Sequence, residues 1–556
     1  MNDILTTCSK HICYQLTGGG KSKSKWKTLE HNGVVLPPVY TKTGVPLLYN
    51  GKKLVLGQQS EEYAMLFAKY TDTEHMQSKT FRKNFFKSWI PYIKSETPEY
   101  GSLIKSIDEC DFSKMYEYLL EEKEKKMAMT KEQKELAKER KRQEEEYYMY
   151  AKVDGKQENL GNFRIEPPGI FMGRGCHPKH GTIKKRIQST DITLNMSGFI
   201  DQTKSVSGER RNWNAVIEDR DSVWIASWKD EITGKTKYVW LSDKSEFKSQ
   251  SDREKFDKAR KLGKSIGKIR QRNAANLNSS DNRLKQLATA LYFIDNLALR
   301  VGGEKGDDEA DTVGVTSLRV EHITLSTDNM VKLDFLGKDS IRYVNKVQVD
   351  PIVYRNLGLF IIGKQKKQDL FDLVTNVSVN DYLKSLNTDS EFVLTAKIFR
   401  TYNASKLFQD ELDKITERVK KSKQKLELNE LLDAYNKANA KVAVLCNHQK
   451  NVSKGFSEAI SKIDNKISEY KEKLKNCSTK DKVLRLKNKI KELKSKKELK
   501  LETKNVSLGT SKINYIDPRI SLAFLELHGI PVEKIFTGTL RDKFSWAFDH
   551  KRNFVF

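Results

Sequence analysis

Two stretches near the carboxyl end of the chain repeat apolar side chains at helical spacing. From residue 460 to 474, and again from 483 to 493, apolar residues recur every three or four positions among Lys and Glu. This spacing lines one face of a helix with apolar side chains. Residues 476–479, Asn-Cys-Ser-Thr, separate the two runs. The pattern predicts two helices that fold back on each other as an antiparallel coiled-coil hairpin, which ends near Asn505.

Shorter patterns elsewhere predict a mixture of helices and strands. Apolar side chains at helical spacing between residues 283 and 298 predict an amphipathic helix. Residues 222–228 and 237–241 are typical of strands. The dipeptide Asn50-Gly51 favours a two-residue hairpin turn between short strands.

Three segments lack the pattern of a buried element. Residues 119–148 are almost entirely Glu, Lys and Arg, so we expect one long, mostly solvated helix there. Residues 162–181 are rich in Gly and Pro and carry several basic side chains, which favours a surface loop. Residues 1 to about 24 are expected to form a short, disordered basic arm.

The composition favours a polyanionic partner. The chain has 556 residues, with 101 Lys and Arg against 74 Asp and Glu, so its formal net charge is +27. Such a charge attracts a polyanion, but it does not distinguish DNA from RNA or from an acidic membrane surface. No apolar run reaches the roughly 18 residues that a membrane helix needs. Residues 1–20 also lack the apolar stretch of a secretory signal.

The six cysteines are scattered along the chain. This distribution indicates reduced thiols in a cytosolic or nuclear setting rather than a disulfide framework. Cys8 and Cys13 have no second Cys or His pair at zinc spacing, so no metal site is predicted.

The string Ser-Lys-Ile-Asn-Tyr-Ile-Asp-Pro-Arg at residues 511–519 stands out in the last part of the chain. It resembles the active-site signature of eukaryotic-type type IB DNA topoisomerases. Further strings resemble other segments of that family and follow in the family's order. They lie at residues 25–31, 81–87, 165–169, 291–295, 335–343, 399–405 and 445–449. Any one match could arise by chance, but the ordered set extends the resemblance from about residue 25 to the end.

The resemblance implies a catalytic set of five residues. It places the nucleophile on Tyr515, ligands of the transition state on Arg300, Arg400 and His448, and the general acid on Lys338. The reaction that it implies is relaxation of positively and negatively supercoiled duplex DNA. One strand is cut through a 3′-phosphotyrosyl intermediate, the DNA swivels, and the strand is resealed.

Each of these side chains suits the chemistry of a phosphodiester. Attack on phosphorus builds negative charge on the non-bridging oxygens, and two guanidiniums can hold those oxygens and stay charged at cellular pH. Donors placed in advance typically supply about 3–4 kcal/mol each. A histidine can add a further hydrogen bond without acting as the base. A lysine ammonium can protonate the leaving 5′-oxygen.

A tyrosine nucleophile makes a separate energy source unnecessary. Its ordinary pKa is about 10, and nearby cations favour the phenolate. Because a phenolate also leaves readily, the covalent bond keeps the energy of the broken linkage for resealing. We therefore expect no cofactor, neither ATP nor a metal ion, with divalent cations at most stimulatory.

The resemblance also implies contacts with DNA. Arg174, Asp339 and Asn514 resemble family positions at the cleavage site, where inhibitors of the camptothecin type act. Lys179 and Lys305 are further expected contacts. Because phosphate contacts carry no sequence information, we expect largely nonspecific binding to double-stranded DNA with a steep salt dependence. We expect a monomer and no membrane partner.

The implied fold is a multidomain mixed α+β structure. It is a bilobed DNA clamp with a mainly helical catalytic domain like that of tyrosine recombinases, and a protruding antiparallel coiled-coil linker. The expected parts are a short basic arm at 1–24, a core DNA-binding subdomain at 25–40 and 131–244, an upper clamp at 41–130, a catalytic core at 245–451, the linker at 452–504 and a C-terminal domain at 505–556. The lysine-rich linker would lie near the DNA and slow its rotation.

Localisation is expected to be nuclear by default. Nuclear members of the family usually carry a long, charged N-terminal extension, whereas about 24 residues precede the core here.

Two other classes of protein remain as alternatives. A tyrosine recombinase uses a similar Arg, Lys, Arg, His and Tyr set, but it usually has His three residues before the second Arg, where this chain has Lys397. A chromatin-structural protein would bind DNA through charge alone and form no covalent adduct. Taken singly, each of the five residues also has an ordinary explanation, such as a packed tyrosine or a solvated turn lysine.

Overall fold

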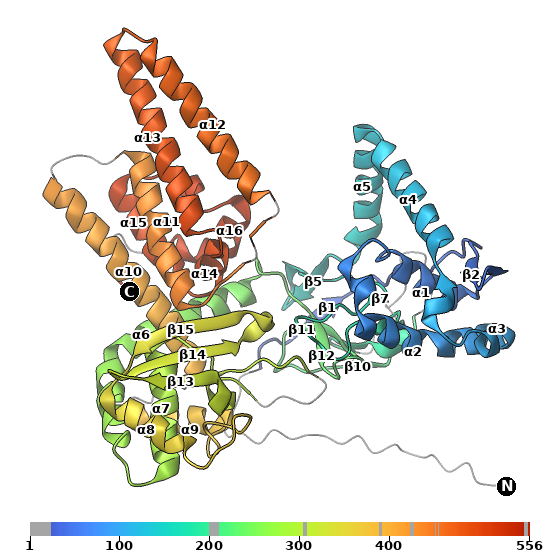
Figure 1. The fold of residues 1–556 in the computed structure, drawn as a ribbon, viewed down its shortest axis with the longest axis horizontal. Helices are drawn as coiled ribbons and strands as arrows, with labels where there is room; N and C mark the ends of the chain where they lie inside the picture. The colour runs from blue at the N-terminus through green and yellow to red at the C-terminus, as the bar shows by residue number, and fades with distance from the viewer. Residues whose placement is uncertain are drawn as a thin grey trace. The chain divides into compact units, whose positions relative to one another are not determined.

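The computed structural model describes residues 24–198, 211–303, 309–387, 392–422, 427–450, 452–453, 455–549 and 554–556. Nearly all of the expected arm at 1–24, and Lys305, lie outside the described residues. Contacts divide the chain into two compact units. Unit 1 comprises Met1–Val39, Met127–Pro168 and Arg186–Ser242, and unit 2 comprises Tyr40–Lys126, Gly169–Lys185 and Asp243–Phe556. Both mix helices with small sheets (Figure 1).

Unit 1 contains two small sheets. The first has the order β1 (Leu29–His31), β5 (Tyr150–Val153), β6 (Lys156–Asn159) and is antiparallel. The second has the order β10 (Ala215–Ile217), β9 (Thr193–Asn195), β11 (Trp224–Lys229), β12 (Thr236–Trp240). In this sheet β10 and β9 are parallel, and the other pairs are antiparallel. The strands predicted at 222–228 and 237–241 are confirmed by β11 and β12.

The prediction of one continuous helix at 119–148 is wrong. The structure has two helices there, α4 (Ser113–Ala128) and α5 (Lys131–Glu146). The second begins at a capping box: the Thr130 side chain accepts a hydrogen bond from the backbone N–H of Gln133, and the Gln133 side chain accepts one from that of Thr130. Thr130 therefore satisfies the first N–H groups of a new helix instead of continuing the old one.

The first part of unit 2 packs short strands against helices. A sheet of order β3 (Lys52–Leu54), β2 (Leu47–Tyr49), β4 (Cys110–Asp111) accompanies α1 (Gln58–Ala68), α2 (Lys79–Glu96) and α3 (Pro98–Leu103), while β7 (Gly169–Ile170) pairs with β8 (Ile183–Lys184). Asn50 and Gly51 both have positive φ, 47° and 78°, which confirms the predicted two-residue turn. The rings of Phe67 and Phe85 stack at 3.9 Å in the core between α1 and α2.

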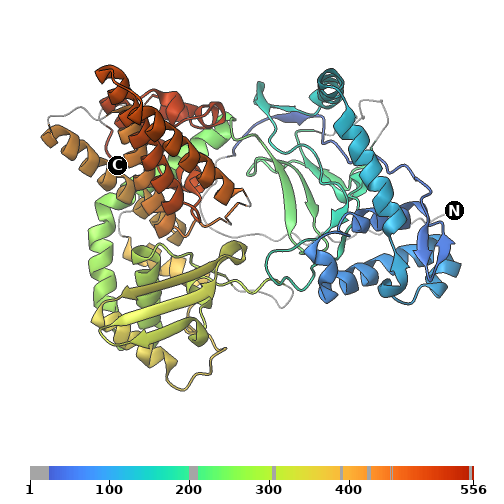
Figure 2. The same ribbon diagram turned by 45° about the horizontal axis from the view of Figure 1, so that its top comes forward.

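The larger part of unit 2 has two cores. The first joins α6 (Glu246–Asn276), α7 (Asn282–Asn296), α8 (Pro351–Ile361) and α9 (Asn376–Leu386) to an antiparallel sheet, yellow in Figure 2, of order β13 (Ile323–Ser326), β14 (Met330–Leu336), β15 (Arg342–Gln348). The helix predicted at 283–298 is confirmed by α7.

The second core is helical. It joins α10 (Ala396–Ser422), α11 (Leu428–Leu445) and α15 (Pro518–His528), and Leu540 of α16 (Gly538–Lys543) packs against it, while α14 (Leu508–Asn514) contacts α11. Its buried residues include Tyr435, Cys446 and Tyr515. Within the described ranges, no helix is both long and apolar enough to cross a bilayer.

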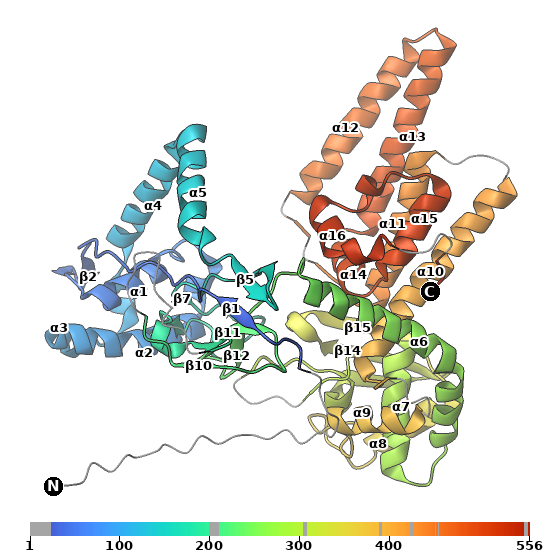
Figure 3. The ribbon, with the colours of Figure 1, turned by 180° about the vertical axis from the view of Figure 1, so that it is seen from behind.

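Two long helices, α12 (Phe456–Lys475) and α13 (Lys480–Glu502), lie side by side as a helical hairpin (Figures 1 and 3). The two predicted helices and the turn between them are confirmed. Ile463, Ile467 and Ile490 form their small buried core, and Lys497 of α13 pairs with Asp464 of α12. The hairpin also contacts α11, where Lys491 pairs with Glu430.

Short 3-10 helices occur in the connections. They are η1 (Glu74–Gln77), η2 (Ile107–Glu109), η3 (Ser189–Asp191), η4 (Val315–Ser317), η5 (Val320–His322), η6 (Lys338–Ser340), η7 (Val532–Lys534) and η8 (Ser545–Ala547).

Candidate active site

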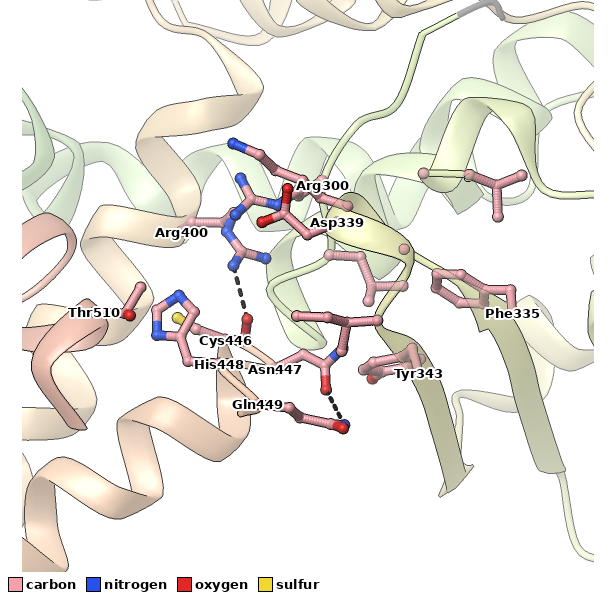
Figure 4. A pocket seen from close by; sticks show the side chains of 16 residues that line it. Arg300, Phe335, Asp339, Tyr343, Arg400, Cys446, Asn447, His448, Gln449 and Thr510 are labelled. Atoms are coloured by element: carbon pink, nitrogen blue, oxygen red, sulfur yellow. Dashed lines mark hydrogen bonds between the residues drawn. The ribbon is translucent and has the colours of Figure 1, made fainter. Parts of the chain in front are cut away.

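A cavity of about 160 Å³ in unit 2 is lined by side chains from distant parts of the chain. Arg300 comes from the segment after α7, Lys338 from the turn between β14 and β15, Arg400 from α10, and His448 from the segment after α11. Figure 4 shows the side chains of Arg300, Arg400 and His448 converging on this space. The fold thus brings four of the five predicted catalytic residues to one cavity, and the ring of the fifth, Tyr515, lies against Arg400 and His448.

Arg400 is buried and held by neutral groups. One terminal nitrogen donates to the carbonyl of Ala298 and the other donates to the carbonyl of Cys446 at 3.0 Å. Its Nε is buried and has no hydrogen-bond partner among the described residues, and within them Arg400 forms no salt bridge. Ala298 has a φ of 49°, a left-handed conformation at the end of α7. The guanidinium is therefore fixed in place while its positive charge is not neutralised.

Arg300 is positioned by its backbone. Its carbonyl accepts the N–H of Val315 at 2.9 Å, and the carbonyl of Val301 accepts that of Thr316 at 2.8 Å. Gly302 and Gly314 pack directly on each other, since a Cβ on Gly314 would lie 2.3 Å from the Gly302 Cα. Only glycines allow this approach, which holds the segment that presents Arg300 to the cavity.

Lys338 lies at the tip of the β-hairpin formed by β14 and β15. The last strand pair is Leu336 with Arg342, and the N–H of Gly337 donates to the carbonyl of Ile341 at 2.9 Å. Asp339 and Ser340 both have positive φ, 69° and 56°, in this tight turn. The Lys338 side chain is exposed and lines the cavity.

Tyr515 follows α14 directly. Its ring centroid lies 5.1 Å from the guanidinium carbon of Arg400 and 5.2 Å from the centroid of the His448 ring. Its carbonyl accepts a hydrogen bond from the Ser405 hydroxyl at 2.9 Å, and the same hydroxyl accepts the N–H of Asp517 at 3.1 Å. Because Ser405 and Arg400 share α10, one helix fixes both the backbone of Tyr515 and its neighbouring cation.

The two arginines change the acidity of Tyr515. Burial by itself raises the pKa of the phenol, but the positive charges of Arg400 and Arg300, with hydrogen bonding to them, outweigh burial and bring the pKa below its ordinary value of 10.0. Stabilisation of the anion by nearby cations has this sign. The site therefore favours the phenolate, which is the nucleophilic form.

His448 is a neutral imidazole at neutral pH. Burial, and then the charges of Arg400 and Arg300, lower its pKa from 6.5 to about 4. Its backbone N–H donates to the Ala443 carbonyl at 2.8 Å, and its carbonyl accepts the N–H of Ser507 at 2.7 Å. Its Nδ1 lies 2.8 Å from the Ser511 Oγ, whereas Nε2 is buried without a partner among the described residues.

The residues predicted to contact DNA, unlike the predicted catalytic residues, do not all lie around one cavity among the described residues. Asp339 lines the cavity and forms a salt bridge with Arg174. Asn514 is exposed beside Tyr515 and donates to the Thr510 carbonyl at 3.0 Å. Lys179 lies in the loop after β7 and is not among the residues that line the cavity. Lys305 falls outside the described residues.

Sequence reasoning gave no role to three residues of this site. Ser405 holds the backbone of Tyr515, Ser511 contacts His448, and Thr510 lines the cavity. Ser511 stands four residues before Tyr515, one helical turn, so its spacing was the available signal. Ser405 gave no comparable signal, because its contact spans 110 positions of the chain.

Together these groups can bind and cleave a phosphodiester. The cavity offers guanidinium donors, an imidazole nitrogen and an ammonium beside a tyrosine hydroxyl, which are the groups that stabilise charge on phosphate oxygens. Among the described residues, no group of three or more His, Cys, Asp or Glu side chains is placed to hold a metal ion.

Comparisons with known proteins give a consistent family. The chain matches the DNA binding fragment of eukaryotic DNA topoisomerase I over residues 24–241, its catalytic core over 244–481, and a C-terminal topoisomerase domain over 487–556. It is 42% identical to DNA topoisomerase 1 beta of Arabidopsis thaliana, over 97% of this chain and 60% of that protein. It is 39% identical to human DNA topoisomerase 1, over 94% of this chain and 71% of that protein. It is also 39% identical to the rat protein named DNA topoisomerase I, mitochondrial, over 95% of this chain and 92% of that protein.

Proposed function

The chain belongs to the eukaryotic DNA topoisomerase I family, and on that basis we propose that it relaxes positively and negatively supercoiled duplex DNA. The chain spans 60% of the length of the Arabidopsis relative. The proposed reaction is transient cleavage of one strand, rotation of the DNA about the other, and resealing. The chain is thus a DNA-strand-breaking isomerase of type IB.

The observation that carries this proposal is the environment of Tyr515. Its ring lies against Arg400, whose charge is held in place by carbonyls and is not neutralised by a carboxylate among the described residues. The Tyr515 Oη attacks the phosphorus, and the bond from phosphorus to the 5′-oxygen breaks as the 3′-phosphotyrosyl bond forms. Arg300, Arg400 and His448 bind the non-bridging oxygens of the transition state, and Lys338 gives a proton to the leaving 5′-oxygen.

Resealing is the same reaction in reverse. The 5′-hydroxyl attacks the phosphotyrosyl phosphorus and returns a proton to Lys338, while the Tyr515 phenolate leaves. Because a phenolate whose pKa is lowered is a better leaving group, the arginines that favour attack also favour release. The cycle conserves one phosphoester bond throughout, so the proposal includes no ATP and no metal ion.

Each part of the chain has a proposed role in binding DNA or in catalysis. We assign residues 25–40 and 131–244 to a DNA-binding subdomain, 41–130 to an upper clamp, 245–451 to the catalytic core, 452–504 to a coiled-coil linker and 505–556 to the C-terminal domain. The clamp would close on duplex DNA as a monomer, with little sequence preference, through phosphate contacts. The lysine-rich hairpin α12–α13 would face the DNA and slow its rotation, so deleting it should change rotation or resealing rates and leave cleavage intact. The expected compartment is the nucleus.

The decisive experiment is relaxation of supercoiled plasmid in EDTA without ATP. The unaltered chain is compared with Tyr515→Phe, and the matched control is Tyr435→Phe, which removes the hydroxyl of a fully buried tyrosine from the same core. Relaxation and a 3′-linked protein–DNA adduct are expected for the unaltered chain and for Tyr435→Phe only.

Other outcomes identify the alternatives. If all three proteins bound DNA but none relaxed it or formed an adduct, the chromatin-structural function would be favoured. Relaxation by Tyr515→Phe would move the nucleophile elsewhere. Sequence-specific exchange between two duplexes would favour a recombinase.

A further inference from the structure

Ser511 makes a contact with His448 that the proposed reaction does not yet use. Its Oγ lies 2.8 Å from His448 Nδ1, and this hydrogen bond is buried. The side chain of Ser511 is fully buried in α14, and His448 is 7% exposed. The contact links the first turn of the helix before the nucleophile to the segment after α11.

The direction of this hydrogen bond follows from the surroundings of the hydroxyl. A serine hydroxyl has one hydrogen to donate. Among the described residues, the His448 ring is the partner of Ser511 Oγ, and no other acceptor contacts it. If Nδ1 carried the imidazole proton, the serine hydrogen would be buried without an acceptor, which is unfavourable. The hydroxyl therefore donates, and Nδ1 accepts.

The other ring nitrogen then has a defined state. A neutral imidazole carries one hydrogen, so acceptance at Nδ1 leaves that hydrogen on Nε2. The Nε2 atom is buried without a partner among the described residues, and His448 lines the cavity together with Arg300 and Arg400. The cavity is thus lined by donors only at these three residues, which suits an anionic phosphate oxygen.

The opposite tautomer would reverse this property. A lone pair on Nε2 would repel a non-bridging phosphate oxygen and could act as a base instead. A change in the partner of Nδ1 would therefore switch His448 between a donor and an acceptor without moving the ring.

We propose that Ser511 is a positioning residue that holds His448 in its Nε2–H tautomer, so that the imidazole donates a hydrogen bond to the phosphate at the cleavage site. That the acceptor of the Nε2 hydrogen is a DNA phosphate rests on the proposed function, whereas the tautomer of His448 does not. The backbone carbonyl of Ser511 also accepts the N–H groups of Tyr515 and Ile516, at 3.0 and 3.1 Å. One residue therefore orients both the nucleophile and the imidazole.

The test begins with the tautomer in the unaltered chain. Histidine labelled with 15N is incorporated, and the His448 signals are assigned by their loss in His448→Gln. The nitrogen that carries hydrogen and the nitrogen with the lone pair have widely separated 15N shifts. We expect Nε2 to be protonated and Nδ1 to be unprotonated at pH 7.5. A protonated Nδ1 in the unaltered chain would overturn the inference without any variant.

Three variants then separate positioning from simple loss of packing. Ser511→Ala removes the donor, Ser511→Thr keeps it, and Ser521→Ala removes a different buried hydroxyl, which contacts Tyr435. We expect Ser511→Ala to shift His448 toward a mixture of tautomers and to slow single-turnover cleavage of a nicked suicide substrate roughly 10- to 100-fold, as for partners that orient other functional histidines. Ser511→Thr should restore both properties, and Ser521→Ala should change neither.

The outcomes distinguish the role of Ser511 from the proposed function. An unchanged tautomer in Ser511→Ala, or equal slowing by Ser511→Ala and Ser511→Thr, would contradict the positioning role. If the tautomer responds as expected but the unaltered chain forms no DNA adduct, the inference about Ser511 stands and the proposed function fails.

Discussion

The cations around Tyr515 and those of the α12–α13 hairpin are used in opposite ways. Arg400 is 5% exposed and donates to two neutral carbonyls, whereas the Lys491 side chain on the hairpin is 73% exposed and pairs with Glu430. In the first region the charge stays uncompensated and acts on its neighbours. It overcomes the effect of burial and lowers the pKa of Tyr515, and it adds to the larger effect of burial in lowering the pKa of His448. In the second, the carboxylate neutralises the charge and water screens what remains.

The difference shows that a cation changes the acidity of its neighbours when it is buried and has no carboxylate partner, and changes it little when it is exposed and paired. Two guanidiniums near a buried phenol change its acidity, while a much larger number of surface lysines changes little beyond the general attraction of the chain for a polyanion. Under the proposed function, most of the formal charge of the chain therefore serves DNA binding, and two arginines serve the chemistry. Five predictions test this contrast, from the largest expected effect to the smallest.

Replacing Arg400 should have the largest effect. Arg400→Ala removes a donor to the transition state, so single-turnover cleavage should fall by about 10³-fold. Arg400→Lys keeps the charge but cannot donate to the carbonyls of both Ala298 and Cys446 while facing the phosphate, so partial activity is expected. Thermal unfolding of each variant serves as the folding control. A loss below about 10-fold in Arg400→Ala would contradict the role of a preorganised cation.

Replacing Arg300 should change both the rate and its pH dependence. Cleavage should rise with pH as Tyr515 ionises and level off above its pKa, which lies below 10.0. Arg300→Ala removes one of the charges that lower this pKa, so the inflection should move to higher pH and the rate at pH 7.5 should fall about 10²-fold. The measurement is single-turnover cleavage from pH 6 to 10. An inflection that does not move would mean that Arg300 acts on the phosphate alone.

Truncating a side chain in the hairpin core should increase opening of the α12–α13 hairpin and leave the rate of DNA cleavage unchanged. Ile490→Ala removes a buried side chain from a core of only three buried residues, at a cost of about 2 kcal/mol. Local opening should then increase roughly 30-fold and appear as faster hydrogen exchange in residues 456–502. Leu484→Ala, at an exposed position of the same helix, is the matched control. If cleavage by Ile490→Ala also fell about 30-fold, the hairpin would support the active site directly.

The protonation of His448 should not limit cleavage near neutral pH. Its pKa in the folded chain, about 4, lies below the ordinary value of 6.5, so the neutral form persists as the pH falls from 7.5 to 5.5. An exposed histidine would lose about tenfold in its neutral fraction over this range. After correction for the ionisation of Tyr515, we expect less than about a twofold change from His448. A break near pH 6.5 that disappears in His448→Gln would contradict its burial.

The smallest effect is expected on the surface of the hairpin. Lys491→Ala removes an exposed ion pair with Glu430, and such pairs contribute about 0–1 kcal/mol. Cleavage should change less than about twofold, and a modest decrease in DNA affinity should vanish at high salt. A loss approaching that of Arg400→Ala would remove the distinction between the two regions.

Local patterns were sufficient for much of the secondary structure. The 3–4 spacing predicted α12 and α13, and Asn50-Gly51 predicted its turn, because these signals depend on neighbours a few residues apart. The helix at 119–148 was predicted without its break, although Thr130 and Gln133 carry the signal of a capping box. The uniform charged composition of the segment favoured one long helix, whereas Thr130 and Gln133 begin a second helix there.

The sequence by itself determined which residues could do the chemistry. The resemblance to a family, carried by the string around Tyr515 and the ordered strings before it, implied a nucleophile, two arginines, a lysine and a histidine. Tertiary structure alone decided how these residues act on one another. The carbonyls of Ala298 and Cys446 hold Arg400, Ser511 faces His448, and the burial of Tyr515 competes with two cations for its acidity. Backbone carbonyls are identical in every residue, and burial depends on segments more than a hundred positions apart, so no local pattern of side chains could specify either.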